Sequence, residues 1–280
     1  MVEKIGILHP GQMGVSVAAS AKNSGHDVYW VSEGRSAETR MRAGSQDLME
    51  IDTLMSLCKI CSVLVSICPP HAAEDLAANV VGCGFKGLYL EANAISPQRV
   101  VRIGEKMKAK GVIFVDGGII GGPAWEPGKT WLYLSGDAAQ RAAGCFANGP
   151  LATEIIGNEI GLASSLKMCF AAYTKGTTAL LCGILAAAER LGIRADLEKQ
   201  WSRGGSDFAV QTRGRVRRVT AKAWRFSGEM EEIAATLALA GLPDGFHLAA
   251  AEIYRRITHF KGLEEPPLEE VLKALLEKNE

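Results

Sequence analysis

Lys167 is the side chain of this sequence best suited to acid–base chemistry. It lies in the stretch from Gly161 to Leu191, which has no proline, few charges and mostly Ala, Leu and Cys. A buried ammonium is costly unless it has a partner or a task, and desolvation lowers a lysine's proton affinity toward the range of general acid–base work. We therefore predict that Lys167 is catalytic and that Tyr173 supplies a further hydroxyl. A lysine that simply reaches the surface is the alternative.

A glycine-rich turn near the N-terminus is the second chemical feature. An apolar run ending at Leu8 leads into His9-Pro10-Gly11-Gln12-Met13-Gly14, and a long Ala- and Ser-rich stretch follows. The free N–H groups and dipole at such a helix start suit a pyrophosphate. Gly11 lets the backbone approach phosphates, and Gly14 lets the helix pack close to the strand. Because His9 replaces the first of the usual three glycines, a turn without a ligand is the alternative.

The loop after the next apolar run, 28–31, bears on which dinucleotide binds. It offers hydroxyl and guanidinium donors at Ser32, Arg35 and Ser36, followed by Thr39 and Arg40. A 2′-phosphate requires such donors, whereas a free 2′-hydroxyl favours an acid at the strand end. Glu33 is the one opposing charge. We predict NADP rather than NAD as the cofactor, and the alternative is an ordinary solvated loop.

Four loops are expected to meet at one edge of a sheet. Apolar strand-like runs end just before the segments 9–14, 67–70, 92–96 and 116–123. In an open α/β sheet, ligands lie outside the carboxyl ends of the strands. The last segment contains Gly121-Gly122-Pro123, whose backbone amides suit a small anionic substrate.

These loops imply a doubly wound, Rossmann-type α/β domain over residues 1–160. Strand and helix patterns alternate through this region and extend to a strand at 151–156. The stretch 161–191 then predicts one helix of roughly 45 Å, apolar on most faces and therefore buried. It would join the first domain to an all-α domain over 161–280, with breaks near Gly192, Gly204-Gly205 and 241–243. We also expect this helix to form a homodimer interface.

Composition narrows the class of protein. The 280 residues have 48% apolar content and zero net charge, which favours a sizeable core and argues against nucleic acid as a partner. No apolar run reaches the ~18 residues of a membrane span, and the chain opens directly into a strand, so we expect a cytoplasmic protein. The seven cysteines suggest reduced thiols. Cys58 and Cys61 are expected in the core, with no metal site.

The motifs together resemble a known family. Their order is a glycine-rich turn, a basic loop, Cys68-Pro69-Pro70, Asn93 with Ser96-Pro97, the 116–122 segment, and Gly161 with Ser164 and Lys167. This order is similar to the β-hydroxyacid dehydrogenase superfamily, which includes 6-phosphogluconate dehydrogenase. A branch with an uncharacterised C-terminal helical domain is the best match, through segments 34–36, 164–169 and 229–234.

The resemblance implies a role for each matching position. Pro10, Gly11, Gln12 and Met13 would hold the pyrophosphate; Ser32, Arg35 and Ser36 the 2′-phosphate; Cys68, Pro69 and Asn93 the ribose and nicotinamide; and Asn93, Gly121, Gly122 and Tyr173 the substrate. Lys167 would take the hydroxyl proton as hydride leaves the carbinol carbon. The implied activity is NADP-dependent oxidation or reduction of a small hydroxy or keto compound. An imine reductase of similar architecture and a non-catalytic NADP-binding protein are the alternatives.

Three positions depart from the family pattern. Asn93 replaces a Ser or Thr, Ala171 replaces an Asn four residues after the lysine, and Gly228-Glu229 falls where a lysine–aspartate pair is expected. These departures argue against a simple 3-hydroxy acid as the substrate. The spacing of Glu229 and Glu232 places them on one helix face, which we expect to be solvated.

Overall fold

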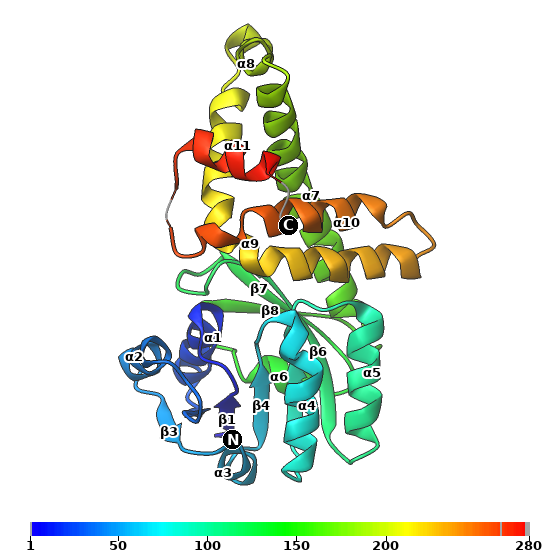
Figure 1. Ribbon diagram of the computed structural model, residues 1–280. Helices are drawn as coiled ribbons and strands as arrows, with labels where there is room; N and C mark the ends of the chain where they lie inside the picture. The colour runs from blue at the N-terminus through cyan, green and yellow to red at the C-terminus, as the bar shows by residue number, and fades with distance from the viewer. Residues whose placement is uncertain (1, 264, 278–280) are drawn as a thin grey trace. The chain divides into compact units, whose positions relative to one another are not determined.

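The computed structural model describes residues 2–263 and 265–277. The chain divides into two compact units, Met1–Met168 and Cys169–Glu280. The first contains an eight-stranded sheet with helices, and the described part of the second is helical (Figure 1). This confirms the predicted fold class, including the long helix α7 (Leu162–Arg190) that continues from one unit into the other. The division into units falls within α7, whereas the sequence-based boundary after residue 160 precedes it.

The sheet has the strand order β3-β2-β1-β4-β5-β6-β7-β8. Its strands are β1 (Lys4–Ile7), β2 (Asp27–Val31), β3 (Met49–Ile51), β4 (Val63–Ser66), β5 (Leu88–Glu91), β6 (Ile113–Gly121), β7 (Thr130–Ser135) and β8 (Leu151–Gly157). Every adjacent pair in the run from β3 to β6 is parallel, whereas β6 and β7 are antiparallel. The order reverses between β1 and β4, so the crevice for a ligand is expected at their carboxyl ends.

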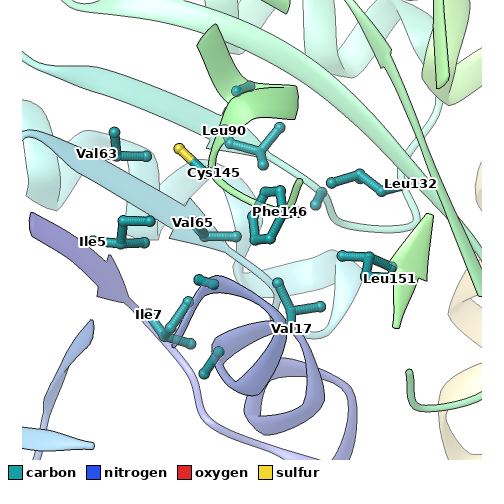
Figure 2. Packing of buried hydrophobic residues seen from close by; sticks show 14 of the residues in the cluster. Ile5, Ile7, Val17, Val63, Val65, Leu90, Leu132, Cys145, Phe146 and Leu151 are labelled. Atoms are coloured by element: carbon teal, nitrogen blue, oxygen red, sulfur yellow. The ribbon is translucent and has the colours of Figure 1, made fainter. Parts of the chain in front are cut away.

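Alternate side chains of each strand point to opposite faces, and each face has its own core. One core contains Ile5, Ile7, Val63, Val65 and Leu90 from the strands, with Val17 and Phe146 packed against them (Figure 2). The other core contains Leu64, Tyr89 and Phe114. Because both faces are covered, the strands are continuous apolar runs rather than alternating ones.

The helices of the first unit divide between these two faces. They are α1 (Gln12–Asn23), α2 (Ala37–Ser45), α3 (Leu54–Ile60), α4 (Ala73–Gly82), α5 (Pro97–Lys108) and α6 (Ala139–Gly144). Residues of α1 and α6 belong to the first core, and residues of α3, α4 and α5 to the second. Pro97 is the first residue of α5 and Ser96 is its N-cap residue, although the Ser96 side chain makes no capping hydrogen bond.

The prediction of a loop over residues 116–123 was wrong. β6 continues to Gly121 and pairs antiparallel with β7, from Asp116 opposite Ser135 to Gly121 opposite Thr130. Glycine weakens a strand and usually argues against one, so the glycines of this segment led to the prediction of a loop instead of a hairpin. Here the glycines fit because their neighbours are close: a Cβ at Gly117 would lie 3.0 Å from Leu90 Cδ1. The connecting loop is therefore confined to residues 122–129.

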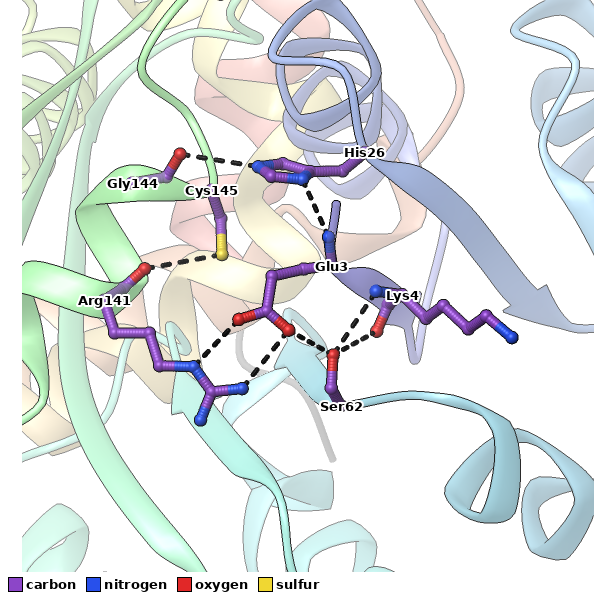
Figure 3. Close-up of polar contacts among 7 residues, drawn as sticks. All are labelled: Glu3, Lys4, His26, Ser62, Arg141, Gly144 and Cys145. Atoms are coloured by element: carbon purple, nitrogen blue, oxygen red, sulfur yellow. Dashed lines mark hydrogen bonds and ion pairs between the residues drawn. The ribbon is translucent and has the colours of Figure 1, made fainter. Parts of the chain in front are cut away.

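A polar cluster joins the start of β1 to α6 and to the residues just before β2 and β4 (Figure 3). The carboxylate of Glu3 accepts from Arg141 Nε at 2.9 Å and Nη2 at 3.2 Å, and also from Ser62 Oγ. The backbone N–H of Glu3 donates to His26 Nδ1 at 3.1 Å. Hydrogen bonds from Arg141 lower the pKa of Glu3 below its usual value. This cluster lies at the amino ends of the strands, away from the edge where ligands bind in such sheets.

The second unit is built from helices. Beyond its share of α7 it contains α8 (Arg194–Trp201), α9 (Phe208–Leu239), α10 (Gly245–Arg256) and α11 (Leu268–Leu276), with no strand among its described residues. Gly192 and Gly241 have φ values of 72° and 73°, so the left-handed conformation that glycine tolerates ends α7 and α9 where the sequence predicted breaks. Gly204, with a φ of 67°, is a non-helical residue in the short 3-10 segment Arg203–Gly205 between α8 and α9, at the third predicted break. The segment Glu264-Glu265-Pro266-Pro267 has the composition of a linker, and Glu264 lies outside the described residues.

α7 is also long and strongly apolar. It is the one described helix long and apolar enough to cross a membrane by length and composition, with a mean hydropathy of 1.3 over its most apolar window, of which 44% is buried. The core helix of a protein without a membrane has the same composition, so this observation carries little weight.

The cysteines show no cross-links. All seven are free. Cys58 of α3 and Cys61, the residue that follows it, are buried in the second core, as predicted, and burial raises the pKa of each thiol to about 12. Within the described residues, no group of three or more His, Cys, Asp or Glu side chains could hold a metal ion.

Candidate active site

The glycine-rich turn leaves the N-terminus of α1 open. Gly11 is the N-cap residue, no side chain caps the helix, and its first turn carries no acidic residue. A Cβ at Gly11 would meet nothing within 4 Å, whereas a Cβ at Gly14 would lie 2.1 Å from His9 O. Gly14 therefore allows the close contact between helix and turn, and Gly11 leaves space above it. Pro10, Gln12 and Met13 flank this space, so the turn fits a pyrophosphate.

His9, at the position of the missing glycine, holds Arg35. The guanidinium of Arg35 lies 2.8 Å from His9 Nδ1 through Nη1 and donates to Leu8 O at 3.0 Å through Nη2. Burial, and then the charge of Arg35, lower the pKa of His9 to about 4, so the imidazole is neutral at pH 7 and accepts this hydrogen bond. Arg35 Nε is buried without a hydrogen-bond partner among the described residues. A nearby anion would satisfy it.

The other predicted donors of the basic loop also make internal contacts. Ser36 is the N-cap of α2, and its Oγ accepts from Thr39 N at 3.3 Å. Arg40 donates to Ser32 O at 3.0 Å and pairs with Glu50 at 2.7 Å. The loop is thus ordered around the α2 N-terminus, which offers its dipole to an anion.

Asn93 joins the loops that follow β4 and β5. Its Oδ1 accepts from the backbone N–H of Cys68, and its Nδ2 donates to Ser66 Oγ at 2.9 Å. The side chain is 3% exposed. Its amide therefore fixes the segment with Cys68 and Pro69 at the carboxyl edge, a contact that the residue types alone did not predict.

Two buried acids lie side by side in this part of the sheet. Glu91 of β5 pairs with Asp116 of β6 in the strand register. Glu91 Oε1 accepts from Asn93 N at 3.0 Å, and Oε2 has no hydrogen-bond partner among the described residues. Burial is the main cause that raises the pKa of Glu91 to about 8, and the charge of Asp116 adds to it. Burial also raises the pKa of Asp116 above its usual value. The sequence analysis did not identify Glu91 or Asp116 as site residues, although each stands at the end of an apolar run.

Lys167 lies on α7 against β6. Its ammonium donates to Ile119 O. A Cβ at Gly118 would lie 2.5 Å from Ala163 O and 3.1 Å from Lys167 Cβ, so only glycine permits this close approach of helix and strand. The side chain of Lys167 is half-buried. It therefore has a backbone acceptor on the strand whose loop was predicted to bind substrate.

The predicted substrate residues differ in their surroundings. Gly121 pairs with Thr130 in the hairpin, at a φ of 126°, and Gly122 O accepts from Thr130 Oγ1 at 2.7 Å. Tyr173 is 72% exposed and belongs to the second compact unit.

Glu229 is buried, although the sequence predicted it on a solvated helix face. It is 6% exposed and pairs with Lys175, whose ammonium lies 4.4 Å from the centre of the Phe226 ring. The ion pair forms because α7 and α9 bring the two side chains together, which helix spacing within α9 could not indicate. Glu232, three residues on, makes contacts of its own.

The chain matches two known protein families. Residues 4–143 match the family described as the NAD binding domain of 6-phosphogluconate dehydrogenase, and residues 188–257 match a domain of unknown function, DUF1932. The chain belongs to the first of these families. It is thus a 3-hydroxyacid dehydrogenase-like protein with an NAD(P)-binding domain and a C-terminal helical region, as the sequence resemblance indicated.

Similar proteins agree with this assignment. An uncharacterised 28.5 kDa protein of Methanothermus fervidus is 27% identical over 197 residues, covering 69% of this chain and 74% of that protein. Conserved protein MTH1747, of unknown function and described as structurally similar to 3-hydroxyacid dehydrogenases, is 27% identical with a TM-score of 0.64, covering 91% of this chain and 97% of its own.

Two more distant structures share the fold. The 3-hydroxyisobutyrate dehydrogenase of Mycobacterium tuberculosis, solved with L-serine, has 18% identity and a TM-score of 0.71, covering 99% of this chain and 100% of its own. An imine reductase of Myxococcus stipitatus, solved with NADP+, has 16% identity and a TM-score of 0.58, covering 98% and 100%.

Proposed function

We propose that this protein is an NADP-dependent oxidoreductase that moves hydride to or from a small hydroxy or keto compound, with Lys167 as the general acid or base. The observation that carries the proposal is the placement of Lys167, whose ammonium is held on the β6 backbone of the same unit that contains the open α1 N-terminus. Family membership supports the dehydrogenase or reductase class.

Each end of the cofactor has candidate ligands. The turn from Pro10 to Met13 would hold the pyrophosphate, and Arg35 with Ser32 and Ser36 would hold a 2′-phosphate near the α2 N-terminus. The unpartnered Nε of Arg35 favours an added anion at this place. When bound, the nicotinamide supplies the hydride acceptor or donor. Cys68, Pro69 and Asn93 would line its pocket, with Asn93 acting through Cys68 N.

In this proposal, Lys167 is the residue that accepts or donates the proton of the reaction. For oxidation, the neutral amine would take the substrate's hydroxyl proton as the carbon loses hydride; for reduction, the ammonium would return a proton to the carbonyl oxygen. Gly121, Gly122 and Tyr173 are the candidate contacts for the rest of the substrate. A cytoplasmic homodimer is the setting that we propose for this activity.

A substrate panel followed by nicotinamide absorbance tests this function. Small hydroxy acids and alcohols are offered with NADP+, and the corresponding keto compounds with NADPH, to wild type and Lys167→Met. Turnover that depends on Lys167 supports the proposal. NADPH binding without turnover of any compound would instead indicate a non-catalytic binding protein.

An imine reductase is the second candidate, because solved imine reductases share the fold over nearly the whole chain. A protonated iminium substrate needs no proton from an acid such as Lys167 during hydride transfer. Cyclic imines belong in the same panel for this reason. Reduction of imines that persists in Lys167→Met would favour this candidate over a hydroxy compound.

A further inference from the structure

A single buried carboxylate satisfies the first turn of α7. Asp116 Oδ2 accepts from the backbone N–H groups of Gly161 at 2.9 Å and Ser164 at 3.1 Å, and Oδ1 accepts from Ser164 Oγ at 2.6 Å. Asp116 is fully buried. A carboxylate at a helix N-terminus is stabilised by the free N–H groups and by the helix dipole.

Ser135 of β7 completes this arrangement. Its Oγ donates to Asp116 Oδ2 at 3.1 Å and accepts from Ala163 N at 3.2 Å. Asp116 and Ser135 lie opposite each other in the β6–β7 hairpin. The start of α7 is therefore fixed by side chains of two paired strands, and its position follows from the sheet rather than from a loop.

Strand β6 contacts the beginning of α7 at three successive places. Asp116 binds the N-terminal amides, Gly118 removes the Cβ that would press on Ala163 O, and Ile119 O accepts from Lys167 Nζ. Lys167 follows Ser164 by three residues, which is about one helical turn. A shift of the helix start would therefore move the lysine relative to the same strand.

We propose that Asp116 is a positioning residue for Lys167, acting through the N-terminus of α7. The inference rests on the proposed function of Lys167 as the acid–base group. Asp116 need not contact substrate or cofactor; its contribution is to fix the height and rotation of the helix that carries the ammonium. Catalytic groups require such placement, because a displacement of about 1 Å can cost about 100-fold in rate.

The test is a double-mutant cycle on the full chain with the best substrate of the panel. Asp116→Asn keeps the size and one acceptor oxygen but cannot accept from all four donors. We expect it to lower kcat by about 10- to 100-fold, to leave the NADPH dissociation constant unchanged, and to shift the pH profile of kcat. In a Lys167→Met background, Asp116→Asn should have no further effect on kcat.

The outcomes separate this inference from the proposed function. If Lys167→Met keeps full kcat, the proposed function fails and this inference fails with it. If Lys167→Met is slow but Asp116→Asn lowers kcat equally in both backgrounds, Asp116 has a general structural role and only the inference is overturned. An unshifted pH profile of kcat in Asp116→Asn would likewise overturn the inference and leave the proposed function standing.

Two variants keep the test informative if Asp116→Asn does not fold. Gly118→Ala adds the Cβ that would lie 2.5 Å from Ala163 O and forces α7 away from β6. Ser135→Ala removes one donor to Asp116 and the acceptor of Ala163 N. Both should lower kcat and lose that effect in the Lys167→Met background. Gly82→Ala is the control, since a Cβ there would meet nothing within 4 Å and kcat should be unchanged. If Gly118→Ala and Ser135→Ala lower kcat by the same factor in the Lys167→Met background as in wild type, the inference is overturned.

Discussion

Arg35 reaches from the loop after β2 to the turn after β1, where its Nη1 lies 2.8 Å from Nδ1 of His9. A glycine at position 9 would leave this guanidinium without its imidazole partner. The low pKa of His9, about 4, keeps the ring an acceptor rather than a competing cation. The departure from the three-glycine pattern thus links the two loops that we assign to the pyrophosphate and to the 2′-phosphate.

Replacing Arg35 by Ala should weaken NADPH binding by about 1.5–3 kcal/mol, the scale of a charge-assisted hydrogen bond. NADH affinity should barely change, because NADH lacks the phosphate. Fluorescence titration of both cofactors measures the difference. Arg42→Ala is a suitable control, since Arg42 pairs with Glu38 on the α2 surface. Equal losses for NADPH and NADH would remove the 2′-phosphate assignment and leave Arg35 as a support for the turn.

Lys167→Met should lower kcat by about 10²–10⁴-fold, the usual contribution of a general acid or base. Methionine retains the length and apolar stem, so NADPH affinity and the melting temperature should stay near those of wild type. Stopped-flow or steady-state turnover, with calorimetry alongside, measures all three. Lys108→Met, at an exposed position of α5, serves as the control. Unfolding of Lys167→Met, or an intact kcat, would show that the lysine is structural.

The sequence predicted the parts of this fold whose signals are local. Continuous apolar runs marked the parallel strands, and Gly192 and Gly241 marked helix ends, because each depends on a few neighbouring residues. The β6–β7 hairpin was missed because Gly117 and Gly118 read as a loop until their close neighbours are known. The contacts of Asp116, Asn93 and Glu229 join distant segments, and no spacing along the chain encodes them.

A dimer should depend on the exposed apolar face of α7. Phe170, Tyr173 and Leu180 share one side of α7 and are 45%, 72% and 45% exposed. Such a stripe favours association with a second copy. Leu180→Asp should therefore give a monomer by light scattering at micromolar concentration, whereas Met55→Asp, on the α3 surface, should not change the mass. A monomeric wild type would contradict the prediction.

The ion pair between Lys175 and Glu229 should matter for stability more than a surface pair. Their side chains are 16% and 8% exposed, so removing one partner leaves a buried charge and should cost about 3–5 kcal/mol of unfolding free energy. The double variant Lys175→Met/Glu229→Gln should recover much of that loss. Urea unfolding measures these differences. Lys273→Met, whose partner Glu277 is exposed, should cost under about 1 kcal/mol. Additive losses in the double variant would refute the coupling.

Glu91 should make the protein less stable as pH rises through neutrality. Its pKa is raised from 4.5 to about 8 in the folded protein, mainly by burial. Below about pH 4.5 the carboxyl is protonated in both the folded and unfolded states, and it does not affect their balance. Between that pH and about 8 the folded state retains a proton that the unfolded state has lost, so the free energy of unfolding falls as pH increases.

Glu91→Gln should remove this dependence, because the amide stays neutral and keeps an oxygen to accept from Asn93 N. The free energy of unfolding, measured by urea at pH 5, 6, 7 and 8, should fall more steeply for wild type than for Glu91→Gln. The variant's advantage should therefore grow with pH and level off above about 8. Glu105→Gln, an exposed change on α5, should follow wild type. Parallel curves for wild type and Glu91→Gln would mean that Glu91 is already ionised in the folded protein near pH 5, and that its buried Oε2 has a polar partner.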